Sequence, residues 1–277
     1  MSKKAVKTEY SVFSRKIKSP VRLALLSDIH ERRADDILAM LRRSKPDIIA
    51  VSGDTFERYG DDGKLPCRKS DLNLFHRALL TVSFNINRFL LFAAGGKNTH
   101  NTQNAYDILS AAANLAPVYL SLGNHERELE DEDIAFLKEK NIHLLDNSDV
   151  VTDIKGEKLI VGGLSSEADE EWIERFSKRD GFKLLLCHHP EYYDLYVRDR
   201  EIDLTLSGHN HGGQIRIFGK GVLSSRSGLF PKYDCGFFDG RLVVSAGCSN
   251  PVAIPRLGNP RELVIIELKP EKVIHGG

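Results

Sequence analysis

The 277-residue sequence has few cysteines, no excess of either charge and no long hydrophobic run. Its four cysteines form no CxxC pair, which argues against a disulfide framework and predicts reduced, mostly buried thiols. Lys plus Arg and Asp plus Glu number 39 each. The chain as a whole is therefore not attracted to a polyanion, and we expect no nucleic-acid partner.

No stretch approaches the roughly 20 apolar residues that a transmembrane helix needs. The N-terminus is basic, with Lys3, Lys4 and Lys7, but it lacks the apolar segment of a secretory signal. We therefore expect a cytoplasmic protein. We expect the basic arm to be a solvated, partly ordered terminus, the alternative being contact with anionic lipid.

Five short groups of potential metal ligands recur along the chain, and six of the ten histidines lie in or beside them. The groups are Asp28-Ile29-His30, Gly53-Asp54, Gly123-Asn124-His125-Glu126, His188 and Gly208-His209-Asn210-His211. Each follows a short apolar run, as expected for loops at the carboxyl ends of buried strands. The series predicts a dinuclear metal site and, with it, hydrolysis of a phosphate ester.

The apolar runs before these groups have the length of buried strands. They are Val21–Ser27, Asp47–Ser52, Val118–Leu122, Phe182–Cys187 and Ile202–Ser207. Apolar residues at helical spacing predict helices that end before Pro46 and before Pro117, and a third after the acidic run Glu128–Asp133.

The second half of the chain is richer in predicted strands. Val150–Ile154 and Lys158–Gly162 flank a short turn and predict a hairpin. Later strands are predicted at Gln214–Phe218, Gly236–Phe238, Leu242–Ala246 and Leu263–Leu268. Strand–helix alternation followed by strands predicts a layered α/β fold within one large domain, residues 1–277.

The segment between Asp54 and Gly123 is longer than one helix and one strand require. We expect a helical cap or insert at about residues 58–104, with a polar loop followed by an apolar helix at Asp71–Ala94. One interpretation is a helix packed against the domain. The alternative is a cap near the mouth of the site that receives a lipid or touches a membrane.

The residue types in the five groups suit hard divalent cations, for which oxygen ligands supply charge and imidazoles fix geometry. Asp28 and His30 share one face of an extended segment, because side chains at i and i+2 do so. His209 and His211 repeat this arrangement. Asp54 follows a glycine that allows close backbone approach, and it is suited to bridge two metal ions.

His125 lies beside a predicted ligand but is not needed as one. Its imidazole suits a general acid that protonates the leaving alkoxide at neutral pH, and we expect Glu126 to orient or tune it. His189 follows His188 directly, so strand alternation predicts that its side chain points to the opposite face.

The set DxH, GD, GNHE, H and GHxH resembles the calcineurin-like metallophosphoesterase superfamily. Ser27–His30, Gly208–Gln214 and the tail Val244–Gly247 with Arg261–Leu263 are similar to its YaeI/YkuE-like bacterial phosphodiesterase branch. The resemblance implies a four-layer αββα sandwich, an α/β fold of two facing sheets flanked by helices. The long segment after Asp54 departs from that pattern.

The resemblance also implies how the ligands divide between two divalent ions, which in this superfamily are Mn, Fe or Zn; we favour Mn. One ion would be held by Asp28, His30 and His211, the other by Asn124, His188 and His209, with Asp54 bridging. Two ions roughly 3.5–4 Å apart can clamp a phosphoryl group and lower the pKa of a bridging water, so that hydroxide attacks phosphorus in line.

We therefore expect a metal-dependent phosphohydrolase that cleaves a phosphodiester or a pyrophosphate. We favour a lipid-linked substrate of the UDP-diacylglucosamine type, with possible peripheral contact at the inner face of the membrane through residues 71–94. A soluble or cyclic-nucleotide phosphodiesterase is the alternative within this chemistry. A non-catalytic metal-binding scaffold for protein interactions is the alternative of another class, disfavoured because no expected ligand is missing.

Overall fold

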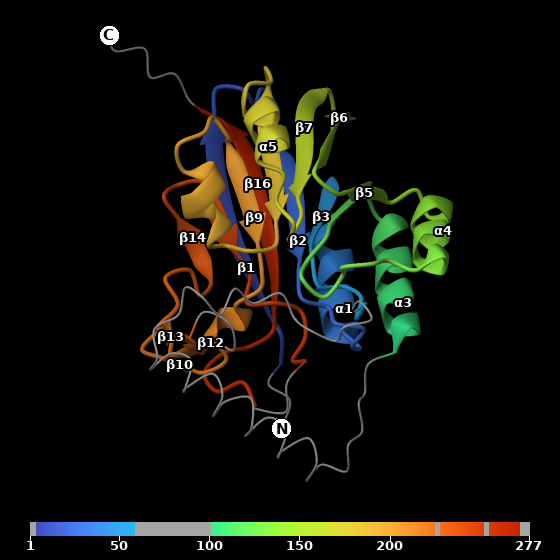
Figure 1. Cartoon of the computed structure of the whole chain (residues 1–277), viewed down its shortest axis with the longest axis vertical. Coiled ribbons are helices and arrows are strands. Elements are labelled where there is room, and N and C mark those ends of the chain that lie inside the picture. Colours follow the sequence, from blue (N-terminus) through green and yellow to red (C-terminus); the bar gives the residue numbers. More distant parts are fainter. Residues whose placement is uncertain (1–3, 59–100, 225–227, 252–254, 272–277) are drawn as a thin grey trace.

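Two six-stranded sheets lie at the centre of the computed structural model, with helices on their outer sides (Figure 1). The structure describes residues 4–58, 101–224, 228–251 and 255–271. This architecture is the four-layer α/β sandwich predicted from the sequence.

The first sheet combines both ends of the described chain. Its strands, in spatial order, are β1 (Val6–Ser14), β16 (Glu262–Pro270), β2 (Val21–Leu26), β3 (Ile48–Ser52), β4 (Val118–Ser121) and β5 (His143–Leu145). β2, β3, β4 and β5 run parallel, whereas β16 is antiparallel to β2 and parallel to β1. The carboxyl ends of β2, β3 and β4 therefore meet at one edge.

The second sheet carries four of the strands predicted in the second half of the chain, whereas the predicted strand Leu263–Leu268 is β16 of the first sheet. Its order is β14 (Gly236–Phe238), β15 (Leu242–Val244), β9 (Leu204–Ser207), β8 (Phe182–Cys187), β7 (Glu157–Leu164) and β6 (Ser148–Ile154). β6 and β7 form the predicted hairpin, and β7, β8 and β9 run parallel. Beyond β9, the chain forms the short turn η3 (His211–Gly213) and two small ribbons, β10 (Arg216–Ile217) with β11 (Lys220–Gly221) and β12 (Leu223–Ser224) with β13 (Gly228–Leu229).

Three apolar layers hold the sandwich together. Between the sheets, Leu23 and Leu25 of β2 share one buried cluster with Leu184 and Leu186 of β8. The helices α1 (Asp35–Ser44), α3 (Thr102–Ala113) and α4 (Asp131–Glu139) pack on the outer face of the first sheet. The second sheet is covered by α5 (Glu170–Ser177) and the short π-helix η2 (Tyr193–Val197). Burial of these apolar faces is what positions the strand ends.

Most of the predicted elements are confirmed. The five predicted strands correspond to β2, β3, β4, β8 and β9. α1 ends at Ser44 because Lys45 is left-handed (φ 47°) and Pro46 follows. The basic arm forms β1, a mostly exposed strand in register with β16 from Val6 opposite Glu262 to Ser14 opposite Pro270.

The predicted apolar helix at Asp71–Ala94 lies outside the described residues. Residues 102–104, the last of the predicted insert, form the first turn of α3, which Asn101 caps by accepting a hydrogen bond from the Gln103 N–H. Of the cysteines, Cys187, Cys235 and Cys248 are unpaired thiols, as predicted, and Cys67 lies outside the described part. In the segments that the structure describes, no helix is long and apolar enough to span a membrane.

Candidate metal centre

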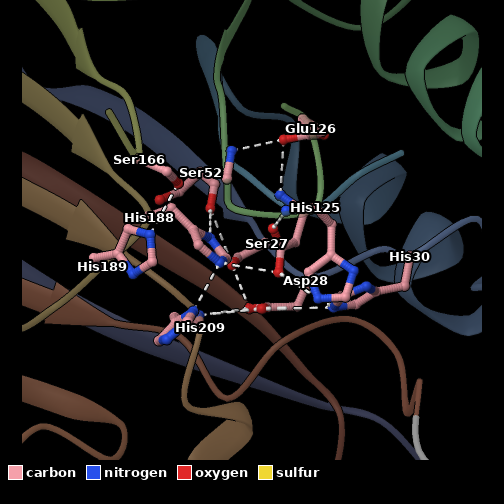
Figure 2. Close-up of polar contacts among 12 residues, drawn as sticks. Ser27, Asp28, His30, Ser52, His125, Glu126, Ser166, His188, His189 and His209 are labelled. Atoms are coloured by element: carbon pink, nitrogen blue, oxygen red, sulfur yellow. Dashed lines mark hydrogen bonds and ion pairs between the residues drawn. The ribbon is translucent and has the colours of Figure 1, made fainter. Parts of the chain in front are cut away.

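Loops at the carboxyl ends of β2, β3 and β4 in the first sheet and of β8 and β9 in the second carry the predicted ligands, of which Figure 2 labels Asp28, His30, His188 and His209. Potential ligand atoms of Asp28, His30 and His211 lie within 4.8 Å of one another, and those of Asp54, His188 and His209 do the same. Asn124 is completely buried. We call the residues from the first sheet (Asp28, His30, Asp54, Asn124 and the adjacent His125) the carboxylate wall, and His188, His209 and His211 the imidazole wall.

The backbone around these residues is unusual. Five of the seven predicted ligands have a positive φ: Asp28 (54°), His30 (50°), Asp54 (53°), His209 (73°) and His211 (47°). This left-handed region is unfavourable for residues with a Cβ and occurs mostly where the surrounding structure enforces it. Such strain concentrated at one place is typical of a functional site.

Two glycines allow the walls to approach closely. A Cβ on Gly208 would collide with the side chains of Ser27 and Asp28, and one on Gly123 would collide with the Asp54 carboxylate. Because Gly208 has no side chain, the His209 N–H lies 3.1 Å from Oδ1 and 3.2 Å from Oδ2 of Asp28. This contact joins the two walls.

His188 is held with one ring nitrogen directed at Asp54. Its Nδ1 lies 2.8 Å from the Ser52 carbonyl, to which it donates, so in the neutral ring, the form that binds a metal, the lone pair is on Nε2. Nε2 lies 3.0 Å from Asp54 Oδ2 and 3.2 Å from His209 Nδ1. A carbonyl that fixes the tautomer is the usual partner of a metal-binding imidazole.

His30 is held in the same way by a carboxylate. Its Nδ1 lies 2.7 Å from Glu57 Oε1, while its buried Nε2 has no hydrogen-bond partner. Nε2 lies 3.9 Å from Asp28 Oδ1 and 3.7 Å from Asp54 Oδ2. A buried nitrogen without a partner, aimed between two carboxylates, fits a metal cation, so this donor set suits divalent ions.

Glu57 is a site residue that the sequence interpretation missed. Its second oxygen, Oε2, lies 2.8 Å from His125 Nδ1, so one carboxylate holds both His30 and His125. His125 Nε2 then lies 3.8 Å from Asp54 Oδ2, within a further ligand group of His30, Asp54 and His125. The only sequence signal for Glu57 is its place three residues after Asp54 in the loop that follows β3.

Glu126 does not have the role predicted for it. Its buried carboxylate accepts the backbone N–H groups of Gly123 (2.7 Å), Asp54 (3.0 Å), Thr55 (2.7 Å) and Phe56 (3.0 Å). It therefore joins the loops after β3 and β4, and Glu57 is the residue that orients His125. Burial, together with the charge of Asp54, raises the pKa of Glu126 to about 7.

The pKa values of the predicted ligands His188, Asp54 and His211 are shifted in different directions. Burial opposes protonation of His188, but the neighbouring Asp54 carboxylate outweighs it and raises the pKa of His188 to about 9. The pKa of Asp54 lies well below its usual range, because the surrounding histidines outweigh its burial. Burial lowers the pKa of His211 to about 3. In the metal-free protein His188 thus carries a proton and His211 does not.

His189 lies at the edge of the imidazole wall rather than in the Asp54 group. Its Nε2 lies 2.9 Å from Ser166 Oγ, and its Nδ1 lies 3.4 Å from the Glu191 carboxylate. His189, Glu191 and His209 form another group of close potential ligand atoms, which the sequence did not indicate because Glu191 follows the strand without a recognisable pattern.

A second layer of charges supports the carboxylate wall. Arg58 makes a two-pronged ion pair with Asp133 of α4 (2.7 and 2.9 Å) and binds Glu31, the neighbour of His30, at 2.8 Å. Tyr106 of α3 donates to the same Asp133 at 2.7 Å. These contacts fix the end of the first ligand loop against the outer helices.

Comparison with known proteins identifies the family. Residues 21–213 match the calcineurin-like phosphoesterase family. The chain belongs to this family. The predicted donor residues, from Asp28 to His211, all lie within the matched region.

Curated relatives agree with the bacterial branch predicted from the sequence. The chain is 27% identical over 210 residues to the uncharacterized protein YpbG of Bacillus subtilis (strain 168), covering 73% of this chain and 65% of the relative. It is 26% identical over 210 residues to phosphodiesterase YaeI of Escherichia coli (strain K12), covering 72% and 63%. The matches thus span slightly less than two thirds of these relatives. The crystal structure of the phosphopantetheinyl hydrolase PptH from Mycobacterium tuberculosis has a TM-score of 0.38 and 12% identity, covering 68% of this chain and 82% of that one.

Proposed function

We propose that this chain is a dinuclear-metal-dependent phosphoesterase that cleaves a phosphodiester or a pyrophosphate. The observation that carries the proposal is the convergence of two donor groups that share no residue, Asp28–His30–His211 and Asp54–His188–His209. Family membership and the similarity to a protein named phosphodiesterase support this reaction class.

In this proposal the donors divide as the family resemblance implies. Asp28, His30 and His211 would hold one divalent ion, Asn124, His188 and His209 would hold the other, and Asp54 would be shared between them. We favour Mn. When bound, two such ions polarise the phosphoryl oxygens and lower the pKa of the attacking water.

His125 acts as the general acid for the leaving oxygen in this proposal. Glu57 binds its Nδ1–H, so Nε2 is the atom that exchanges a proton with the substrate. The His125 side chain is 13% exposed and that of His30 only 1%, so His125 lies on the more accessible side of the carboxylate wall. Its orientation by a carboxylate also argues against a non-catalytic scaffold, which needs no such arrangement.

A chromogenic phosphodiester offered to the Mn-loaded protein tests the reaction class. We expect turnover, and we expect His125→Ala to lower kcat by about 10²- to 10⁴-fold, the usual contribution of a general acid, without loss of Mn. His143→Ala is a matched control, because His143 is exposed and stacks on Tyr119, away from the donor groups. Absence of turnover with every divalent metal and a broad ester panel would contradict the proposal.

We further propose that the substrate is lipid-linked, and that the protein meets it at the inner face of the membrane. Ile217 (52% exposed), Phe218 (102%), Phe230 (68%) and Leu257 (52%) are exposed on loops that follow the predicted ligand His211. Backbone bonds tie these loops together, from Leu257 to Gln214 and from Phe230 to Val222. Exposed apolar side chains on segments that follow a proposed ligand favour a ligand with an apolar portion.

Two substrates compared side by side test this choice. Deleting Asp71–Ala94, or changing Phe218→Ser, should lower turnover of a lipid pyrophosphate far more than turnover of a small soluble diester. Leu195→Ser is the matched control, because Leu195 is also an exposed apolar residue (64%) but lies on η2. Equal loss on both substrates would favour the soluble or cyclic-nucleotide phosphodiesterase instead.

A further inference from the structure

Arg256 brings an unpaired guanidinium group to the edge of the candidate metal centre. Its Nη2 lies 3.2 Å from His211 Nδ1 and donates to the Ser249 carbonyl at 2.6 Å, and its Nη1 lies 3.4 Å from the Pro260 carbonyl. Its buried Nε has no hydrogen-bond partner, and among the described residues no carboxylate lies within ion-pair distance of the guanidinium, although the charge of Asp28 acts on it. Buried charges are normally paired, so this arrangement lacks an anion.

The loop that carries Arg256 is built around the predicted ligands. Ser249 Oγ donates to the Asp28 carbonyl at 2.9 Å, and Asn259 Nδ2 donates to the His211 carbonyl at 2.6 Å. A Cβ on Gly247 would lie 3.2 Å from Asp28 Oδ2 and 3.3 Å from Arg256 Nη2. The guanidinium is therefore placed between the Asp28 and His211 segments.

The tautomer of His211 determines what Arg256 can bind. His211 Nε2 is the nitrogen that faces Asp28, at 3.5 Å from Oδ1. If Nε2 provides its lone pair to a metal, the ring proton must lie on Nδ1. Nδ1–H and Arg256 Nη2–H are then two donors 3.2 Å apart. Two converging donors are stabilised by an acceptor that both can reach.

The net charge of the site indicates the chemical class of the acceptor that His211 and Arg256 would bind. The seven predicted ligands include only two carboxylates, so two divalent ions would leave the centre positively charged, and Arg256 adds to that charge. A phosphate group supplies both the negative charge and the oxygens that a guanidinium fork binds. A carboxylate from the protein would instead have been expected among the contacts of Arg256.

We propose that Arg256 binds a non-bridging phosphate oxygen of the substrate together with the Nδ1–H of His211. This inference rests on the proposed phosphoesterase function. It gives the loop after β15 a direct role in binding, and it makes Arg256 a specificity-determining residue for substrates with an accessible phosphate oxygen.

Binding of inorganic phosphate to the Mn-loaded protein, measured by calorimetry, tests the proposal without turnover. We expect Arg256→Ala to raise the phosphate dissociation constant about 10- to 100-fold, as for loss of a charge-assisted hydrogen bond, with Mn content unchanged. Arg256→Lys should recover part of the loss, because it restores the charge but not the fork. Arg261→Ala is the matched control, because Arg261 lies nearby but pairs with Asp36 at 2.6 Å.

The results distinguish failure of this proposal from failure of the proposed phosphoesterase function. Phosphate binding by Arg256→Ala at the wild-type strength would overturn the proposal, even if esters are hydrolysed. Arg256-dependent phosphate binding without hydrolysis of any ester would support it and contradict the proposed function. If Arg256→Ala does not fold, Arg256→Gln carries the same test, because its amide can still donate to the Ser249 carbonyl.

Discussion

The two walls of the candidate centre are built from different chemistry. The carboxylate wall holds Asp28 and Asp54, and further carboxylates, Glu57 and Glu126, fix its loops. The imidazole wall consists of histidines, which are held by the Ser52 carbonyl at His188 and by the Asp28 carboxylate at the His209 N–H. One wall therefore supplies negative charge and the other supplies lone pairs.

Because of this difference, we expect substitutions of equal size in the two walls to have unequal effects on metal binding. Loss of charge on the carboxylate wall removes the attraction for both metal ions. Loss of an imidazole removes one directional donor. The predictions below test that asymmetry.

Asp54→Asn should have the largest effect. We expect loss of both ions and a fall in kcat/KM of about 10³-fold or more, because metal-ion catalysis supplies several kcal/mol of transition-state stabilisation. His209→Ala should retain close to one ion per chain. Metal content measured by mass spectrometry, together with kcat/KM, distinguishes Asp54→Asn from His209→Ala. Equal loss of metal in Asp54→Asn and His209→Ala would contradict the proposed difference between the carboxylate wall and the imidazole wall.

Glu57→Gln should have the next largest effect. Glu57 holds His30 and His125 without being a predicted ligand, so we expect a fall of about 10- to 100-fold in activity or metal affinity, as for other residues that orient metal ligands. Glu191→Gln is its counterpart at the imidazole wall, where the carboxylate lies 3.8 Å from His209 Nε2. We expect a smaller effect there. A larger loss in Glu191→Gln would reverse the proposed asymmetry.

Metal binding should depend on pH through the imidazole wall. The pKa of His188 is raised to about 9, so the metal-free protein holds a proton that a metal must displace. Apparent metal affinity should therefore rise about tenfold per pH unit as pH increases toward 9, for each proton released. Calorimetry in buffers of different ionisation enthalpy measures the released protons. A pH-independent affinity between pH 7 and 9 would contradict this assignment.

Asp133→Asn should affect stability and leave the chemistry nearly unchanged. Burial opposes ionisation of Asp133, but hydrogen bonds from Arg58, Tyr106 and the Glu130 N–H outweigh it and lower the pKa. A carboxylate with a lowered pKa stabilises the fold above its unfolded pKa of about 3.9, and this contribution is lost as pH falls through the folded value. We expect Asp133→Asn to lower the free energy of unfolding by about 1–3 kcal/mol at pH 7.

Urea unfolding of the metal-free protein at several pH values measures this effect. The difference between wild type and Asp133→Asn should shrink below about pH 4, where the wild-type carboxyl also becomes neutral. Asp131→Asn is the matched control, because Asp131 lies in the same helical turn but is exposed. A difference that persists unchanged at low pH would mean that charge is not the cause.

The sequence predicted the donor residues because each follows a strand, and parallel strands end at one edge. That logic located Asp28, Asp54 and His188 without knowledge of their contacts. It could not locate Glu57 or Arg256, because the loops that carry them have no periodic pattern and their roles depend on side-chain direction. It also misjudged Glu126, since four backbone N–H groups converge on this carboxylate only after the loops from β3 and β4 fold together.

The sequence also did not predict the pairing of β1 and β2 with β16. A basic segment near the N-terminus gives no indication of its partner when that partner lies some 250 positions away, as Val6 opposite Glu262 does. Here tertiary context outweighed local composition.

The position of β16 has a consequence for how the protein is made. This strand lies between β1 and β2, although it is synthesised long after both. While the ribosome is still translating, the first sheet lacks an interior strand, and Ser249, Arg256 and Asn259 have not yet reached Asp28 and His211. Docking of β16, and of the loop that brings Arg256 to His211, must therefore follow translation of these C-terminal residues.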